Sequence, residues 1–167
     1  GALSSLSGEI KVASTKVDPS ELSAEARQKV GNRPVFDISV TADGKNVSDF
    51  DGAVTVFVPY TPKPGEDLDA IVVYYINSKG EPKVLINSGY DSKTGCVVFT
   101  AEHFPRYAVG YNKVSFTDVK ENDWYEEAVT FIAAREIASG TGGGNFSPQA
   151  NLTRGQFIVM LMKAYGI

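Results

Sequence analysis

The sequence predicts an α+β protein, with an N-terminal antiparallel β-sandwich that includes one short helix and a small C-terminal helix–loop–helix module. Residues 8–112 hold short runs of isoleucine, valine and aromatic residues, each bounded by Gly, Pro, Asn or Asp, which is the pattern of strands joined by tight turns. After Tyr111 the apolar residues recur at helical spacing instead. This change of period places a boundary near Asn112, and we expect two domains, 1–112 and 113–167.

Seven strands are predicted in the first domain. Alternation of apolar and polar residues is clearest in Phe36–Val40 and Val54–Val58, where one face of each strand would point inward. Seven short and closely spaced strands favour a sandwich over a parallel sheet. The predicted strands are Glu9–Val17, Val35–Thr41, Ala53–Pro59, Ala70–Ile76, Lys83–Ile86, Cys96–Thr100 and Tyr107–Tyr111.

The connections between these strands carry recognisable turn chemistry. Asn77–Gly80, Asp91–Gly95 and Ala42–Lys45 combine Asn or Asp with Gly, as hairpin turns do. Tyr60–Gly65 holds too much proline for a central strand, and we expect an exposed loop there.

Three helices are predicted. The one in the first domain would have Ser20 as its N-cap and would stop at Gly31. The two helices of the second domain are expected over Trp124–Ile137 and Phe157–Tyr165, with Gly140–Gly144 in the loop between them.

Composition argues against several function classes. The net charge of −4 argues against a nucleic-acid partner, and no apolar stretch approaches the ~20 residues of a membrane span. The single cysteine, Cys96, excludes an internal disulfide and a cysteine-cluster metal site, and its strand-like surroundings favour a small apolar role. The chain starts at Gly1 with neither methionine nor a signal peptide, so we expect a fragment of a longer polypeptide.

The sequence predicts no catalytic, cofactor or metal site. The single histidine, His103, has no nucleophile placed beside it by any motif. The acidic pairs in Asp49–Gly52 and Asp67–Asp69 lack the spacing of a calcium loop. Four tyrosines are expected to pack at strand ends, with their hydroxyls in water, rather than to form a sugar-binding face. They are Tyr60, Tyr74, Tyr75 and Tyr90.

The last third of the chain carries an ordered set of short motifs. They are Phe116-Thr117-Asp118-Val119, Trp124-Tyr125, Ala128-Val129, Gly140, Phe146-Ser147-Pro148 and Leu152-Thr153-Arg154-Gly155-Gln156-Phe157. Their order and spacing resemble the S-layer homology module, a cell-wall anchor of bacterial surface proteins. The resemblance implies an extracellular place at the cell wall or S-layer of a Gram-positive-type bacterium. It also implies binding to secondary cell-wall polysaccharide, often through an acidic sugar that carries a pyruvate ketal. Family members usually carry three modules that pack together, so further modules of the same or another chain are expected partners.

Arg154 is the residue of this module that helix formation does not explain. Thr153 and Gln156 fit a capping box, in which Thr153 accepts from the amide of Gln156 and Gln156 reaches back. A cation in the first helical turn, however, opposes the helix dipole. Arg154 and the amides of a helix N-terminus would together suit a carboxylate or phosphate. The resemblance accordingly implies a polysaccharide site at Arg154, Trp124, Asp118, Gly140, Thr153 and Gln156.

Structural roles also account for several of these residues. Trp124 shares a helix face with apolar residues and is expected in a core or interface, while the resemblance allows it to stack on a sugar ring. Asp118 would cap a turn ahead of the first helix, or lie near the sugar groove as part of the opening motif. Gly140 supplies backbone freedom in the loop. Glu136 stands where the family commonly has glycine, so it must either be strained or let the helix run on.

The end of the first domain carries a second resemblance. His103-Phe104-Pro105 and the run to Tyr111 resemble the end of ZU5-like β-sandwich domains, some of which cleave themselves between Phe and Ser. Pro105 occupies the serine position and has no hydroxyl for that attack, so the resemblance implies the fold without self-cleavage. Similar β segments precede S-layer homology modules in clostridial-type surface proteins.

Together these observations predict a non-catalytic fragment of a bacterial surface protein. We expect the module to anchor to wall polysaccharide and the β domain to serve as a spacer or scaffold. The alternatives are a protein-interaction module of a surface protein and a carbohydrate-binding accessory domain of an extracellular hydrolase.

Overall fold

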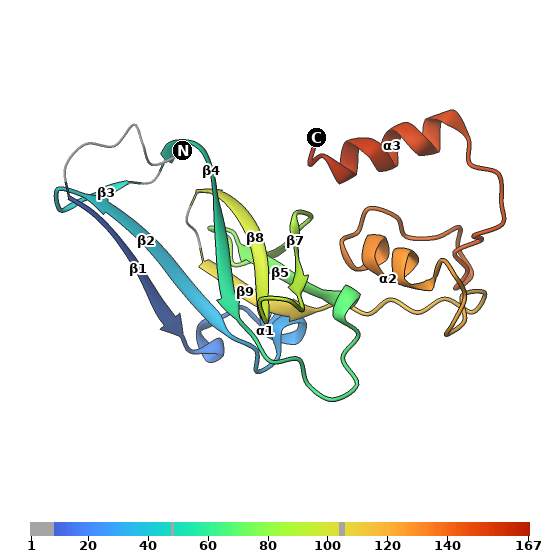
Figure 1. Cartoon of the computed structure of the whole chain (residues 1–167), viewed down its shortest axis with the longest axis horizontal. Helices are drawn as coiled ribbons and strands as arrows, with labels where there is room; N and C mark the ends of the chain where they lie inside the picture. The colour runs from blue at the N-terminus through green and yellow to red at the C-terminus, as the bar shows by residue number, and fades with distance from the viewer. Residues whose placement is uncertain (1–8, 48, 104–105) are drawn as a thin grey trace.

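The computed structural model describes residues 9–47, 49–103 and 106–167, and it confirms the predicted α+β class (Figure 1). Within these ranges the strands pair in two sheets, and every pair is antiparallel. The first sheet consists of β1 (Ile10–Val17), β2 (Val35–Ala42), β3 (Lys45–Val47), β5 (Ile71–Ile76), β6 (Pro82–Leu85) and β9 (Arg106–Tyr111). Its order is β1-β2-β9-β5-β6, with β3 paired to β2. The second sheet, in the order β4-β8-β7, consists of β4 (Asp49–Pro59), β8 (Cys96–His103) and β7 (Ser88–Asp91).

One hydrophobic cluster is built from residues of both sheets. Phe99 of β8 and Tyr107 of β9 lie at its centre, with ring centroids 4.8 Å apart. Removal of such side chains from water is the main favourable term in folding. The buried members are Phe36, Ile38, Tyr60, Ile71, Val73, Val97, Phe99, Ala101, Tyr107 and Val109.

The other face of the first sheet is covered by helix α1 (Ala24–Val30). Val72 and Tyr74 of β5 point to this side and share a second cluster with Ala26 and Val30. Because β5 is covered on both faces, four consecutive residues from Ile71 to Tyr74 are buried, and the strand shows no alternation.

The first helix begins later than predicted. Ser20 is not its N-cap: residues Pro19–Glu21 form a separate 3₁₀ turn, and the Asp18 carboxylate accepts from the Ser20 amide at 2.8 Å. Ser23 caps α1 instead, since its hydroxyl accepts from the Ala26 amide at 3.2 Å. Gly31 ends the helix with φ of +62°, as predicted.

All seven predicted strands are present, with some ends displaced, and the three predicted turns connect strands. In the turn between β2 and β3, Asp43 and Gly44 both adopt positive φ, as a two-residue hairpin requires. Sequence analysis missed β3 and β7. Both are short and carry mainly polar residues or glycine, so neither shows a strand-like apolar pattern.

The strands β1 and β4 lie at the edges of their sheets and border a common apolar groove. The groove encloses about 710 Å³, and Val12 and Val56 line it from the two strands. Val12 is 61% exposed, so this side of the molecule is open.

The C-terminal part of the chain contains helices α2 (Glu126–Ala134) and α3 (Arg154–Ala164). Helix α2 is shorter than predicted at both ends, because Trp124 precedes its N-cap and Glu136 follows its C-cap in a left-handed conformation with φ of +59°. Of the two alternatives expected for Glu136, the structure shows backbone strain, and the helix does not continue through this residue. Helix α3 begins directly after Thr153, as the predicted capping box requires.

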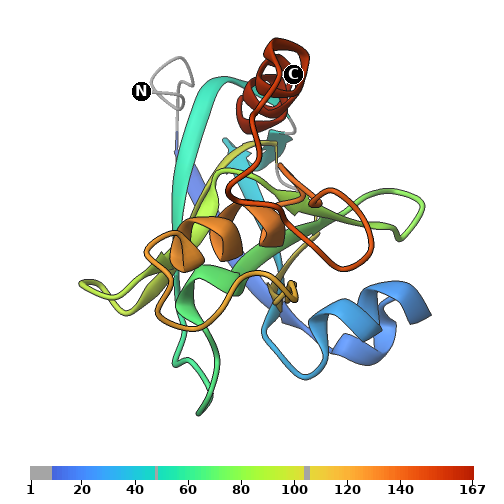
Figure 2. The ribbon, with the colours of Figure 1, turned by 90° about the vertical axis from the view of Figure 1, so that its right-hand side faces the viewer.

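The two helices differ in how they pack. α2 lies against the sheets, whereas most of α3 stands away from them and the helix has no buried residue (Figures 1 and 2). The buried side chains of α2 are Val129, Thr130, Ala133 and Ala134.

Arg135, directly after α2, joins the helix to residues of both sheets and to Asp69. Its side chain is 1% exposed. Nε and Nη2 donate to the carbonyl oxygen of Ser88 at 2.9 and 2.7 Å, Nη1 donates to Asp69 at 2.9 Å, and Nη2 donates to Ile71 at 3.3 Å. Nη1 also donates to the Phe131 carbonyl at 3.0 Å. Burial lowers the pKa of Arg135 to about 10, so the group remains charged at neutral pH and its charge is solvated by these carbonyls.

Candidate functional site

Asp118 holds the segment that precedes α2 against the loop that precedes α3. Its carboxylate accepts from the backbone amides of Phe146 at 2.8 Å and Ser147 at 2.7 Å. The first of these hydrogen bonds is the largest cause of a lowered Asp118 pKa. The predicted role as a cap of the turn before α2 is therefore wrong, because the carboxylate is committed to a segment 28 and 29 residues away. Ser147 has φ of +63°, and this clamp helps to hold that unfavourable conformation.

Gly140 is required by close packing as well as by its backbone conformation. Its φ is +79°, and a Cβ placed on it would lie 2.4 Å from the carbonyl oxygen of Asn145 and 2.9 Å from the ring of Phe116. The Phe116 ring in turn contacts Phe146, with centroids 5.2 Å apart. Gly140 thus allows the loop to close over the aromatic pair.

Thr153, Arg154 and Gln156 lie together at the N-terminus of α3. The predicted capping box is confirmed, since the Thr153 hydroxyl accepts from the Gln156 amide at 3.2 Å and the Gln156 side chain accepts from the Thr153 amide at 2.9 Å. Arg154 is the first helical residue and is exposed. Its charge opposes the helix dipole at this position, as the sequence indicates.

Trp124 lies on the surface. Its side chain is 90% exposed, and its ring packs edge-on against Tyr125 with centroids 5.3 Å apart. The prediction of a core position within this chain is therefore wrong. An exposed indole offers a flat apolar surface with one N–H donor.

A cavity of about 640 Å³ separates the end of α2 from α3 and is bordered by the loop between them. Of the six predicted site residues, Gly140 and Gln156 line it, while Arg154, Thr153, Asp118 and Trp124 are not among its lining residues. Sequence analysis did not single out Lys163, which also lines the cavity and donates from Nζ to the Glu136 carbonyl at 3.2 Å. A lysine in the last turn of a helix is ordinary, so its position carried no signal.

The four tyrosines do not form one face. Tyr74 is 1% exposed within β5, and Tyr60 is buried with its hydroxyl donating to Glu66 at 2.8 Å. The expectation that their hydroxyls reach water is wrong for these two, and only Tyr75 lines an open pocket with other polar groups.

Within residues 9–47, 49–103 and 106–167, no group of three or more His, Cys, Asp or Glu side chains is placed to hold a metal ion. Cys96 is half-buried at the start of β8, as predicted. Phe104 and Pro105, which carry the ZU5-like resemblance, lie outside the described residues. None of the described helices is long and apolar enough to cross a membrane.

Comparisons with known proteins identify the C-terminal part of the chain. The family model of the S-layer homology domain matches residues 115–158. The chain is 27% identical over 133 residues to an amylopullulanase of Thermoanaerobacterium thermosulfurigenes, a match that covers 80% of the chain and 7% of that protein. It is 36% identical over 56 residues to an endoglucanase of Bacillus sp. (strain KSM-635), covering 34% of the chain and 6% of that protein. The chain thus spans a small fraction of the length of these relatives.

No solved structure gives a significant match. The segment that the S-layer homology model matches, residues 115–158, contains Gly140 and the capping box with Arg154. It also contains Asp118 with the two amides that its carboxylate binds. Residues 115–158 therefore form an S-layer homology domain, which indicates a surface protein located at the cell wall or S-layer.

Proposed function

We propose that residues 113–167 anchor this chain to secondary cell-wall polysaccharide and that Arg154 contacts an acidic sugar of that polymer. The observation that supports this most is the exposed Arg154 at the first position of α3, inside the segment matched by the S-layer homology domain. The first amides of a helix have no acceptor within the helix, and a guanidinium binds a carboxylate through two parallel hydrogen bonds. Together they suit a pyruvate-ketal carboxylate.

In our proposal the rest of the chain supports this anchor and has no catalytic role. The β domain, which we propose to be a ZU5-like β-sandwich, acts as the spacer or scaffold to which α2 is fixed by Arg135. Because the relatives are named as an amylopullulanase and an endoglucanase, we further propose that the chain holds an extracellular polysaccharide hydrolase at the wall.

Sedimentation with isolated cell walls tests the proposal. The chain should sediment with intact walls and stay in solution with walls stripped of the secondary polymer. Arg154→Ala removes a charged hydrogen-bonding group worth roughly 1.5–3 kcal/mol, so affinity should fall about 10-fold or more. Arg154→Lys keeps the charge but loses the two parallel hydrogen bonds of the guanidinium, so its affinity should lie between those of the wild type and Arg154→Ala. Arg27→Ala, which removes an exposed arginine of α1, serves as the matched control. Equal sedimentation with both wall preparations would contradict the proposal.

The open apolar surface of α3 favours a second function, contact with further S-layer homology modules of the same or another chain. An isolated helix of this length is marginal in water, and burial of an apolar face is what normally stabilises it. The exposed large apolar side chains on α3 and beside its two ends are Leu152, Phe157, Ile158, Val159, Leu161, Met162, Tyr165 and Ile167.

Sedimentation equilibrium over a concentration series checks this second function. Self-association that Leu161→Glu abolishes would support it, because the new charge would lie in the contact. A monomer mass at all concentrations, with and without an added chain carrying S-layer homology modules, would contradict it.

A further inference from the structure

An open pocket lies at one end of the core between the two sheets, and the strand register explains it. After β6 the chain crosses from the first sheet to the second through Ile86 and Asn87. β7 then pairs with β8 only as far as Ser88 opposite Phe99. The last residues of β8 therefore extend beyond β7, and the end of the core beside them is not covered by that strand.

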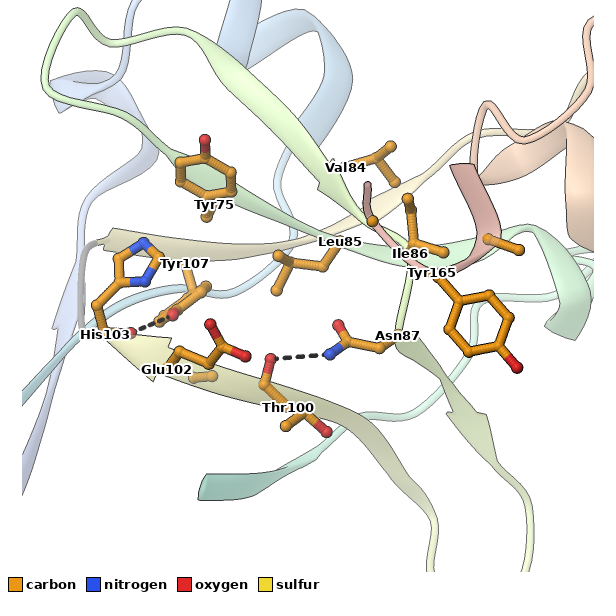
Figure 3. Close-up of a pocket in the computed structure, with 13 residues that line it drawn as sticks. Tyr75, Val84, Leu85, Ile86, Asn87, Thr100, Glu102, His103, Tyr107 and Tyr165 are labelled. Carbon is orange, nitrogen blue, oxygen red and sulfur yellow. Dashed lines mark hydrogen bonds between the residues drawn. The ribbon is translucent and has the colours of Figure 1, made fainter. Parts of the chain in front are cut away.

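This pocket encloses about 390 Å³, within the range of about 300–1,000 Å³ usual for small-molecule sites. Leu85, Ala101 and Tyr107, which belong to the core between the sheets, also line the pocket. Figure 3 shows Tyr75 and His103 at one end and Tyr165, which follows α3, at the other. The rings of Tyr75 and His103 meet edge-on, with centroids 6.0 Å apart.

Polar groups lie along one side of the pocket (Figure 3). The Asn87 amide donates to the Thr100 carbonyl at 3.3 Å, which fixes its orientation and presents its own carbonyl oxygen as an acceptor. The exposed Glu102 lies on the same side. The Tyr107 hydroxyl donates to the His103 carbonyl at 2.6 Å and so fixes the end of β8.

The lining chemistry restricts the ligand. No lysine or arginine is among the lining residues and Glu102 carries a negative charge, so an anion would be repelled. An ammonium cation can donate hydrogen bonds but cannot accept them. It would use only the acceptors on Asn87 and Glu102 and would leave the donors on Tyr75 and His103 without a partner. Hydroxyl groups both donate and accept, and the C–H face of a pyranose packs against aromatic rings and Leu85.

We propose that this pocket binds a neutral pyranose unit of an oligosaccharide. Tyr75 provides the aromatic wall, and Asn87 and Glu102 bind hydroxyls. The site is distinct from Arg154, whose charge suits an acidic sugar, so it would give the β domain a carbohydrate contact of its own. The proposal does not depend on wall anchoring.

NMR titration of the ¹⁵N-labelled chain with maltohexaose, cellohexaose and xylohexaose tests the proposal. At least one of them should cause saturable shifts centred on the amides of Tyr75, Asn87 and Glu102, with a dissociation constant at or below about 1 mM. Tyr75→Ala should weaken binding about 10-fold or more. Phe57→Ala, which removes an exposed aromatic ring outside the pocket, should leave it unchanged.

Because Tyr75 is half-buried, Glu102→Gln provides a second variant that keeps the side-chain shape and should also weaken binding several-fold. Absence of saturable shifts with all three oligosaccharides would overturn the proposal. Shifts centred elsewhere, or binding that survives both Tyr75→Ala and Glu102→Gln, would overturn it as well. Stronger binding of Nα-acetyl-lysine methylamide, whose side chain is a cation, than of every oligosaccharide would overturn the proposal and assign the pocket to cations.

Discussion

Replacing Arg135 by methionine should release α2 from the two sheets. Methionine keeps an unbranched apolar side chain but donates no hydrogen bond. The carbonyl oxygens of Asp69, Ile71 and Ser88 would then face a buried interface without the guanidinium that now bridges them.

The size of the effect follows from these three acceptors. A buried polar group left without its partner costs about 1–3 kcal/mol. We take the lower end of this range for each carbonyl, because the substitution also removes a buried cation. Burial of that cation has a free-energy cost of its own, which is the cause of the lowered Arg135 pKa of about 10. The sum is about 3 kcal/mol, or roughly 150-fold in an equilibrium constant. Such a loss is a large part of the roughly 5–15 kcal/mol by which domains are usually stable.

Hydrogen exchange measures this loss where it occurs. Amides of α2 from Val129 to Ala134 should lose roughly 150-fold in protection in the Arg135→Met variant, while those of β5 and β9 should keep theirs. Arg27→Met, at an exposed arginine of α1, is the matched control and should change stability by less than about 0.5 kcal/mol. Unchanged protection of α2 in Arg135→Met would refute the reasoning.

Three further predictions concern the S-layer homology domain. Gly140→Ala should destabilise it by about 1–3 kcal/mol in thermal unfolding, because the new Cβ would lie 2.4 Å from the Asn145 carbonyl oxygen; an unchanged melting temperature would contradict this. Thr153→Ala should lower the helicity of α3, measured by circular dichroism, through loss of a cap worth about 1 kcal/mol, whereas Thr153→Ser should retain it. The pKa of Asp118 is lower in the folded state than in the unfolded state. Its carboxylate therefore stabilises the fold fully above the unfolded-state pKa, and this stabilisation is lost as pH falls through the folded-state pKa. Asp118→Asn should therefore destabilise the domain at neutral pH, and its difference from wild type should shrink below about pH 4; a constant difference would count against the clamp.

Local patterns in the sequence predicted the strands and turns well. Phe36–Val40 alternates because one face is buried, and Asp43 with Gly44 supplies the backbone conformation that a tight hairpin needs. The capping box at Thr153 was predictable for the same reason, since its partners lie three residues apart.

Features that depend on distant partners were not predictable. Asp118 was predicted to cap a turn ahead of α2, and only the position of Phe146, 28 residues later in the chain, identifies its partner. Arg135 lies near the end of a predicted helix without any distinguishing pattern, and only the arrangement of Asp69, Ile71 and Ser88 makes it a buried link between α2 and the sheets. Helical spacing predicted a core or interface position for Trp124, but the helix begins after it and leaves the indole exposed on the surface of this chain.

The edge strand β1 has a consequence for how the chain behaves at high concentration. Unpaired edges of two molecules can add to one another, and natural sheets prevent this with lysines along the edge and with charges that point inward. Lys11 and Lys16 are both exposed on β1, and Lys16 points into the groove shared with β4. These positive charges stand on one edge of a protein whose net charge is negative, and their loss would favour intermolecular strand pairing.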